Sequence, residues 1–373
     1  SEAPFLNSIS RKGYYTPLSR TFALGKGLGT SIYTGTTRNT NKVWCDYVLR
    51  DKPYSNPSFF KICVRLCDLI PSDKFNKYSR YAVYRLFNKP FGTPNIIPPD
   101  LLDFFKLNPG NQEIVTMFDH ISNNGKQYCV SGLSPSLFDP TSKSILEEMK
   151  KDCDLFFIKF GALDKLGHKY GPESDEIRER VSQLDKVLKN LVESAPDKYT
   201  HFVFFSDHGM TPVHNEINLF SLLDKLPVKF PEDYLFFLHS TIACFWFNNN
   251  EAEKIINEAL QKVDFGDILD RSEREELGID KIGSEYGELI FTLKKGHVFF
   301  PDFYRKKASP KGMHGYAIQD YDKPILIIHS LNSKADDIEE KDEVGHIDIM
   351  PTVLDLLDLP IPSTCEGDSL IIK

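Results

Sequence analysis

Three short segments carry side chains that could bind a metal ion. Asp164 and His168 are four residues apart, so one helical turn would place a carboxylate beside an imidazole. Asp207 and His208 follow an apolar run, and His314 is flanked by glycines shortly before another such run. All three segments lie near predicted strand ends, where α/β sheets place their sites. Carboxylate and imidazole groups suit zinc or manganese, so we expect these five side chains to converge on metal.

Spacing alone does not assign Asp207 and His208 to one metal ion. Successive side chains of a regular strand point to opposite faces, whereas at an irregular strand end they can converge. His346 is a further histidine that could serve as a ligand. Because it stands at the entrance to a predicted terminal helix, we expect it to pack there rather than to bind metal.

A glycine-rich stretch, Gly25-Lys26-Gly27-Leu28-Gly29, allows two interpretations. Its glycine spacing fits neither a Walker A loop nor a dinucleotide-binding loop. Its backbone amides could hold an anion at the start of a helix, with Lys26 binding the phosphate of a substrate. The stretch could equally be a turn that has a packing role and binds no ligand.

The elements that must position these residues are those of an α/β fold. Apolar runs at 154–160, 201–205 and 324–328 are typical of buried, largely parallel strands. Between the first two runs, apolar residues recur at helical spacing after Ser174, a predicted N-cap. A strand, a helix and a second strand in this order are the unit of a parallel sheet.

Two regions interrupt this order. Residues 51–110 are rich in Lys, Pro, Asn and Phe and are expected to form an insertion. Residues 232–305 are expected to form an α+β cap subdomain, with a strand at 242–247, a helix at 251–263 and a hairpin-like stretch at 288–300. The α/β core then comprises residues 1–50, 111–231 and 306–373.

The order of the metal-binding segments resembles the alkaline phosphatase superfamily, in particular its nucleotide pyrophosphatase/phosphodiesterase branch. The segments that carry this resemblance are Asp164-x-x-x-His168, Asp207-His208-Gly209-Met210, His314-Gly315-Tyr316 and the tail from Asp348 to Leu354. The resemblance implies an α/β fold with a mostly parallel sheet, helices on both faces and a small α+β cap. It also implies a metal-dependent hydrolase of phosphate esters, with a phosphodiester or nucleotide pyrophosphate favoured over a monoester.

The resemblance implies two zinc ions, with manganese as the alternative metal. Asp164, His168 and His314 would hold one ion, and Asp207 and His208 would hold the other. In the family the second ion also takes an aspartate from the first strand. No such strand precedes Pro4 in this sequence, so we expect the natural chain to begin upstream of residue 1.

The nucleophile is the second departure from the family pattern. Counting back from the Thr34-Gly35 turn places Gly25, which has no hydroxyl, where the family carries its nucleophile. Thr21 could serve instead if the loop is shifted. The alternative function is a catalytically impaired member that binds a metal and a phosphorylated ligand or partner.

Two further enzyme classes fit the sequence less well. A metal-dependent mutase or transferase would need longer insertions. A sulfatase would need a Cys-x-Pro-x-Arg motif near the nucleophile region, and this sequence has none there.

Composition limits the partners and the compartment. The chain carries 45 basic and 53 acidic residues, a formal net charge of −8, which disfavours bulk nucleic acid as a partner. No apolar stretch is long enough to span a membrane. The seven cysteines are an odd number scattered over a large chain, so we expect reduced thiols and a cytoplasmic protein. The partner that the resemblance implies is a small-molecule phosphate ester.

Overall fold

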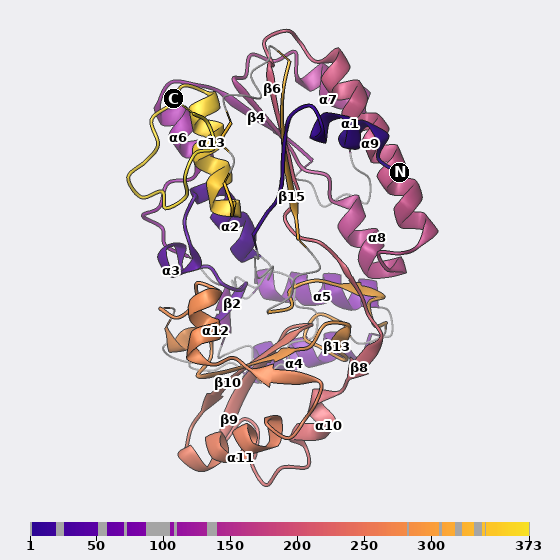
Figure 1. Ribbon diagram of the computed structural model, residues 1–373. Helices are drawn as coiled ribbons and strands as arrows, with labels where there is room; N and C mark the ends of the chain where they lie inside the picture. The colour runs from indigo at the N-terminus through magenta and orange to yellow at the C-terminus, as the bar shows by residue number, and fades with distance from the viewer. Residues whose placement is uncertain are drawn as a thin grey trace.

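The chain folds into two lobes, with the sheet strands of each lobe at its centre (Figure 1). The computed structural model describes residues 2–19, 26–50, 58–70, 73–86, 105–107, 110–132, 140–281, 283–305, 308–317, 323–331, 338–339 and 341–372. Among these residues, no helix has both the length and the apolar character required to cross a bilayer.

The upper lobe is built on strands that the apolar runs predict. The central strand β15 (Ile325–Ser330) lies between β1 (Tyr14–Pro17) and β6 (His201–Phe205). A second pair joins β4 (Tyr128–Ser131) to β5 (Leu155–Ile158) in parallel. Three predicted strands are therefore present, but β15 runs antiparallel to both neighbours. The parallel prediction is wrong for this strand, because a continuous apolar run reports burial on both faces and not strand direction.

Helices cover both faces of these strands (Figure 1). On one side lie α1 (Pro4–Ser10), α7 (Ser142–Glu148), α8 (Ala162–Tyr170) and α9 (Asp175–Ser194). On the other lie α2 (Lys26–Thr34), α3 (Arg38–Asn41), α6 (Met117–Asn123), η4 (His346–Asp348) and α13 (Ile349–Leu356). The predicted N-cap is confirmed, since Ser174 Oγ accepts a hydrogen bond from the Ile177 N–H that starts α9.

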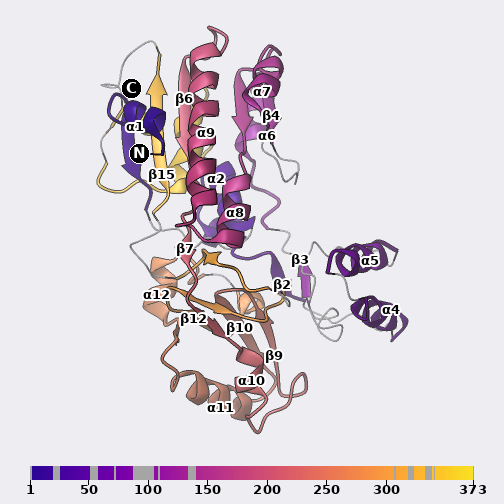
Figure 2. The same cartoon turned by 90° about the vertical axis from the view of Figure 1, so that its right-hand side faces the viewer.

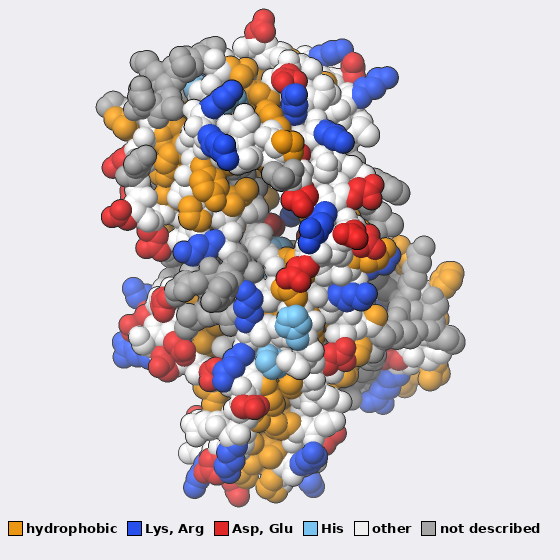
Figure 3. All heavy atoms as spheres, turned by 45° about the vertical axis from the view of Figure 1, so that its right-hand side comes forward, with side chains coloured by type: hydrophobic (Ala, Val, Ile, Leu, Met, Phe, Trp, Pro, Cys, Tyr) orange, Lys and Arg blue, Asp and Glu red, His pale blue; other side chains and the backbone are white. Residues whose placement is uncertain are grey.

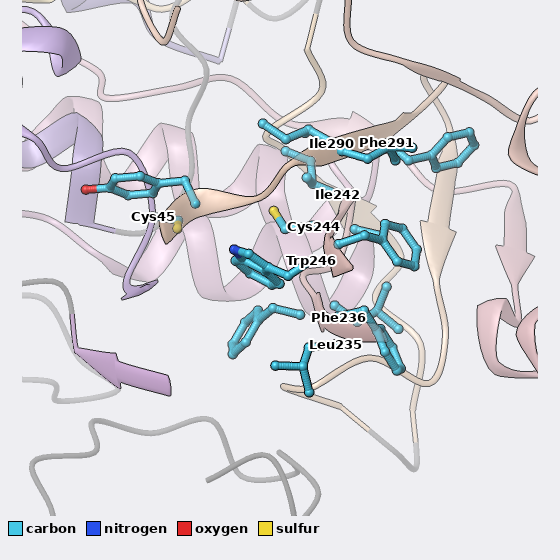
Figure 4. Packing of buried hydrophobic residues seen from close by; sticks show 14 of the residues in the cluster. Cys45, Leu235, Phe236, Ile242, Cys244, Trp246, Ile290 and Phe291 are labelled. Atoms are coloured by element: carbon cyan, nitrogen blue, oxygen red, sulfur yellow. The ribbon is translucent and has the colours of Figure 1, made fainter. Parts of the chain in front are cut away.

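The lower lobe has an antiparallel four-stranded sheet in the order β11-β12-β10-β9. These strands are β9 (Tyr234–Leu238), β10 (Ile242–Phe247), β11 (Gly266–Ile268) and β12 (Leu289–Leu293). The helical elements are α10 (Leu219–Leu223), α11 (Asn250–Leu260), α12 (Arg271–Glu276) and η2 (Ser284–Tyr286). Buried side chains such as Phe236, Trp246 and Phe291 fill its core (Figure 4).

Two of the three elements predicted in this lobe are confirmed, and the third is wrong. The predicted strand at 242–247 is β10, and the predicted helix at 251–263 is α11. The stretch at 288–300 is not a hairpin, because β12 pairs with β10 and β11 while β13 (His297–Phe299) pairs in parallel with β8 (Asn215–Ile217). Alternating apolar residues predict an extended strand but do not determine its partner.

The described part of the predicted insertion contains a pair of helices. They are α4 (Ser58–Asp68) and α5 (Asp73–Leu86), which lie side by side at the edge of the molecule (Figure 2). The buried guanidinium of Arg80 joins them, donating from Nε to Asp68 Oδ1 at 2.7 Å. The strand β3 (Phe105–Leu107) pairs with β2 (Tyr47–Leu49). The boundaries predicted for the insertion, the core and the cap remain predictions.

The prediction that every cysteine is a reduced thiol is wrong. Cys129 and Cys153 form a disulfide, with their Cα atoms 5.9 Å apart. Cys129 lies in β4 and Cys153 shortly before β5, and these two strands are neighbours. Pairing of the strands therefore brings together two cysteines that are far apart in sequence, and their spacing gave no sign of it.

Candidate metal centre

Three elements of the upper lobe bring the candidate ligands together. Asp164 and His168 lie on α8, while Asp207 and His208 directly follow β6. His314 directly follows β14 (Gly312–Met313), which pairs with β7 (Thr211–Pro212) just beyond His208. The site lies where the two lobes meet, and Figure 3 shows a hollow there with acidic and histidine side chains around it.

Two glycines allow these elements to approach closely. A Cβ atom at Gly312 would lie 2.5 Å from the carbonyl oxygen of Gly167, which belongs to α8. A Cβ at Gly167 would lie 3.0 Å from the Cε atom of Met210. The absence of side chains at both positions therefore lets β14 and the segment after β6 pack against the helix that carries Asp164 and His168.

Asp164 lies at the centre of the cluster. Its Oδ1 atom is 3.3 Å from His168 Nε2, 3.6 Å from His314 Nε2 and 3.9 Å from His208 Nε2. One potential ligand atom from each of Asp164, His208 and His314 lies within 4.8 Å of the others. The rings of His208 and His314 stack with their centroids 3.6 Å apart.

Backbone carbonyl groups fix the tautomers of two histidines. His168 Nδ1 lies 2.8 Å from Gly312 O, and His208 Nδ1 lies 2.8 Å from Gly209 O. A carbonyl oxygen only accepts, so each Nδ1 carries a proton, and in the neutral ring Nε2 then has the lone pair. Burial lowers the pKa of His168, which also favours the neutral ring. Both rings thus present the nitrogen that a metal ion would need.

The cluster fits a divalent metal ion. Asp164 Oδ1 is buried, and no group in the described part of the chain donates a hydrogen bond to it. It faces the Nε2 atoms of His168 and His208, whose Nδ1 atoms donate to backbone carbonyls, so a cation between these acceptors would satisfy both sides. Zinc binds such atoms at about 2.0–2.2 Å in a tetrahedral arrangement, which places neighbouring ligand atoms about 3.4 Å apart. The separations of 3.3, 3.6 and 3.9 Å approach this value.

Asp207 lies beside this cluster. Its Oδ1 atom is 3.8 Å from His208 Nε2 and accepts a hydrogen bond from the His208 N–H at 3.2 Å. His208 Nε2 is therefore almost equally far from Asp207 and from Asp164. All five predicted ligands occupy one locus, while their division between two metal ions remains a prediction.

The residues proposed for catalysis and phosphate binding cannot be placed in the same way. Thr21 and Gly25 lie outside the described residues, as does the side chain of Lys26, whose backbone begins α2. For Gly27 the packing interpretation has direct support. A Cβ atom there would lie 2.6 Å from Val43 O and 2.8 Å from Trp44 O, so α2 can approach this loop only with glycine at that position.

The position of His346 supports its predicted packing role. It is 2% exposed at the start of η4, and its Nε2 donates to Ser206 O at 3.1 Å. Burial lowers its pKa to about 4, so the ring is neutral. Since Ser206 directly precedes Asp207, His346 holds the strand end that presents Asp207 and His208.

One charged group near the site carries no sequence motif. Arg305 contacts Met313, the residue before His314, with Nη1 3.9 Å from Sδ. No local motif marks this arginine, because its anchoring hydroxyl group, that of Ser240, is distant in sequence and meets it only in the folded chain.

Comparisons with known proteins agree with this geometry. Residues 81–317, more than half of the chain, match the model of a family described as type I phosphodiesterase / nucleotide pyrophosphatase. A segment of 68 residues is 43% identical to human ectonucleotide pyrophosphatase/phosphodiesterase family member 7. A segment of 142 residues is 26% identical to GPI ethanolamine phosphate transferase 1 of Yarrowia lipolytica. These segments cover 17% and 34% of this chain and only 15% of either relative.

Solved structures show the same fold over nearly the whole chain. Murine ectonucleotide pyrophosphatase/phosphodiesterase 5 superposes with a TM-score of 0.66 and 16% identity, covering 96% of this chain and 91% of that one. Phosphonoacetate hydrolase from Sinorhizobium meliloti 1021 superposes with a TM-score of 0.56 and 13% identity, covering 94% and 88%. At these identities the likeness establishes an alkaline phosphatase-like α/β fold.

Proposed function

Because the chain belongs to the type I phosphodiesterase/nucleotide pyrophosphatase family, we propose that it is a metal-dependent hydrolase of phosphate esters. We further propose zinc as the metal, with manganese as the alternative. A phosphodiester or a nucleotide pyrophosphate is the favoured substrate class, ahead of a monoester. The observation that carries the proposal is Asp164 Oδ1, a buried acceptor surrounded by the Nε2 atoms of three histidines.

The residues of this chain would have separate tasks in such a reaction. Asp164, His168, Asp207, His208 and His314 would hold the metal. When bound, zinc supplies a Lewis acid for phosphate oxygens and a means of activating an oxygen nucleophile. Hydrogen bonds to Gly312 O and Gly209 O hold two of the imidazole rings in the binding orientation before substrate arrives. Lys26, at the start of α2, is proposed to bind the phosphate.

The first experiment separates metal-dependent hydrolysis from a merely structural cluster. Hydrolysis of bis-(p-nitrophenyl) phosphate is measured with added zinc or manganese for the wild type, Asp164→Asn and Asp175→Asn. Asp175 is an exposed carboxylate in the first turn of α9 and serves as the matched control. We expect slow turnover in the wild type and the control, and at least about a hundredfold loss in Asp164→Asn. Equal rates in all three proteins would contradict the proposal.

Two alternatives to hydrolysis, a catalytically impaired binding protein and a transferase, are tested with the same substrate. Thr21 is the proposed nucleophile, so fast turnover abolished by Thr21→Ala would establish a working enzyme. Metal retention without any turnover would favour a catalytically impaired protein that binds a phosphorylated ligand. The similarity to an ethanolamine phosphate transferase raises group transfer as a third function, and phosphorylated product formed with added alcohol in place of water would reveal it.

A further inference from the structure

Arg305 brings a positive charge from the lower-lobe side to the candidate metal centre. Its Nη1 atom donates to Ser240 Oγ at 2.7 Å and lies 3.5 Å from Asp302 Oδ2. The same nitrogen lies 3.9 Å from the sulfur of Met313, the residue before His314. The guanidinium is thus a neighbour of the cluster without belonging to it.

A buried carboxylate fixes the loop that carries Arg305. The side chain of Asp302 is fully buried, and both of its oxygens accept hydrogen bonds. Oδ2 accepts from Ser240 Oγ at 2.6 Å, while Oδ1 accepts from the N–H groups of Tyr304 at 2.7 Å and Arg305 at 2.6 Å. The loop from 302 to 305 therefore has little freedom, because one carboxylate accepts hydrogen bonds from the backbone of both Tyr304 and Arg305.

The turn between β9 and β10 connects this loop to the metal centre. Ser240 lies in that turn, and the neighbouring Thr241 donates from Oγ1 to Gly315 O at 2.6 Å. His239 Nδ1 lies 3.1 Å from the hydroxyl of Tyr304. One short turn thus contacts both the loop of Arg305 and the residue after His314, so the distance between the guanidinium and the cluster is fixed by the fold.

The rest of the guanidinium is available for a ligand. Within the part of the chain that the structure describes, Nη1 makes every polar contact of the group, and Nε and Nη2 contact no protein acceptor. The side chain is 26% exposed. Nη1 alone compensates the charge of Asp302. This interaction therefore leaves Nε and Nη2, two donors in the plane of the guanidinium, unused. Paired donors of this kind match the oxygens of a phosphate or carboxylate group.

We propose that Nε and Nη2 of Arg305 bind a second anionic group of the substrate, next to the phosphoryl group held at the metal cluster. The ligand class is a phosphate ester that carries another phosphate, as in a nucleoside polyphosphate. Arg305 thereby selects such substrates over diesters whose substituents are uncharged. This inference rests on the proposed hydrolytic function, and it adds the residue that sets specificity.

The kinetic test compares two substrates that differ in this second charge. One is ATP, cleaved with water to AMP and pyrophosphate, and the other is bis-(p-nitrophenyl) phosphate. For Arg305→Gln we expect kcat/KM to fall about 10- to 100-fold on ATP and less than about threefold on the uncharged diester. Arg271→Gln, which alters an exposed arginine of the same lobe, should change neither value. An equal loss on both substrates in Arg305→Gln would overturn the inference.

A binding measurement separates this inference from the proposed function. Failure of the wild type to hydrolyse either substrate would reject hydrolysis, but AMP and ADP can still be titrated calorimetrically into the zinc-loaded protein. We expect the wild type to bind ADP more tightly than AMP and Arg305→Gln to lose this preference. Equal loss of affinity for both nucleotides would overturn the inference.

A second variant covers the case in which Arg305→Gln does not fold. Arg305→Lys keeps the charge but not the paired donors, so it should retain only part of the preference for ADP. A full preference for ADP in this variant would overturn the paired-donor geometry.

Discussion

His239 shows how burial sets the charge of a single side chain. It lies in the turn between β9 and β10, is 4% exposed, and has its Nδ1 3.1 Å from the Tyr304 hydroxyl. Burial lowers its pKa to about 3, so the ring is neutral in the folded protein at any pH near neutrality. In the unfolded chain the same ring titrates near its ordinary value of about 6.5.

This difference predicts loss of stability in mild acid. As pH falls below about 6.5, the unfolded chain binds a proton that folded His239 cannot bind, so the free energy of unfolding falls. Between pH 7 and 5 one such histidine contributes a loss of about 2 kcal/mol. Urea unfolding at pH 7 and pH 5 should therefore show a smaller pH effect in His239→Gln than in the wild type. His201→Gln, which alters an exposed histidine, should keep the full effect, and an unchanged effect in His239→Gln would contradict the prediction.

The proximity of the candidate ligands could be predicted from the sequence, but their supporting contacts could not. Residue type and position at strand ends were sufficient to nominate Asp164, His208 and His314, which the fold brings within 4.8 Å of one another. The groups that orient the rings are backbone carbonyls such as Gly312 O, which every residue possesses and no motif marks. Arg305 was missed for a related reason, because its role depends on a distant serine and a buried aspartate.

At the scale of elements, one buried carboxylate attaches α1 to α9. Asp185 is 2% exposed on α9 and accepts hydrogen bonds from the N–H groups of Phe5 at 2.9 Å and Leu6 at 2.8 Å. These N–H groups belong to the first turn of α1, which has no partners for them within the helix. The negative charge of the carboxylate also interacts favourably with the positive end of the helix dipole. The carboxylate therefore serves as a cap supplied by another helix.

Removing the Asp185 carboxylate should weaken the attachment of α1 to α9. Asp185→Ala leaves two N–H groups without their acceptor, so we expect a loss of about 2–4 kcal/mol in the free energy of unfolding. Asp185→Asn keeps one acceptor oxygen and should lose less. Lys186→Ala, at the exposed neighbouring position, is the control and should change stability by less than about 0.5 kcal/mol. Denaturant unfolding measures all three, and wild-type stability in Asp185→Ala would contradict this role.

Elements were easier to predict than the pairings between them. The runs at 201–205 and 242–247 became β6 and β10 because long apolar segments rich in aromatic residues favour buried strands. The antiparallel direction of β15 and the partner of β13 depend on tertiary contacts. The Cys129–Cys153 disulfide follows from the pairing of β4 with β5, so it could not be predicted before that pairing was known.

At the scale of the whole molecule, the candidate metal centre joins segments that are far apart in the chain. Asp164 comes from α8, His208 from the end of β6 and His314 from the loop after β14. The unfolded chain does not hold these side chains together, so a metal ion bound by all of them binds the folded state alone. Such a ligand stabilises the fold by about 2.7 kcal/mol when its free concentration is a hundred times its dissociation constant.

Metal removal should therefore lower the stability of the whole chain. We expect the melting temperature of the zinc-loaded protein to fall when a chelator is added, whereas Asp164→Asn should melt at one temperature with or without chelator. Asp175→Asn should respond as the wild type does. One tightly held ion is expected after dialysis, because once three of the five predicted ligands hold it, only two are left for a second catalytic zinc, which usually takes three. Elemental analysis decides this point, since two retained equivalents of zinc would mean that a further ligand completes the second site.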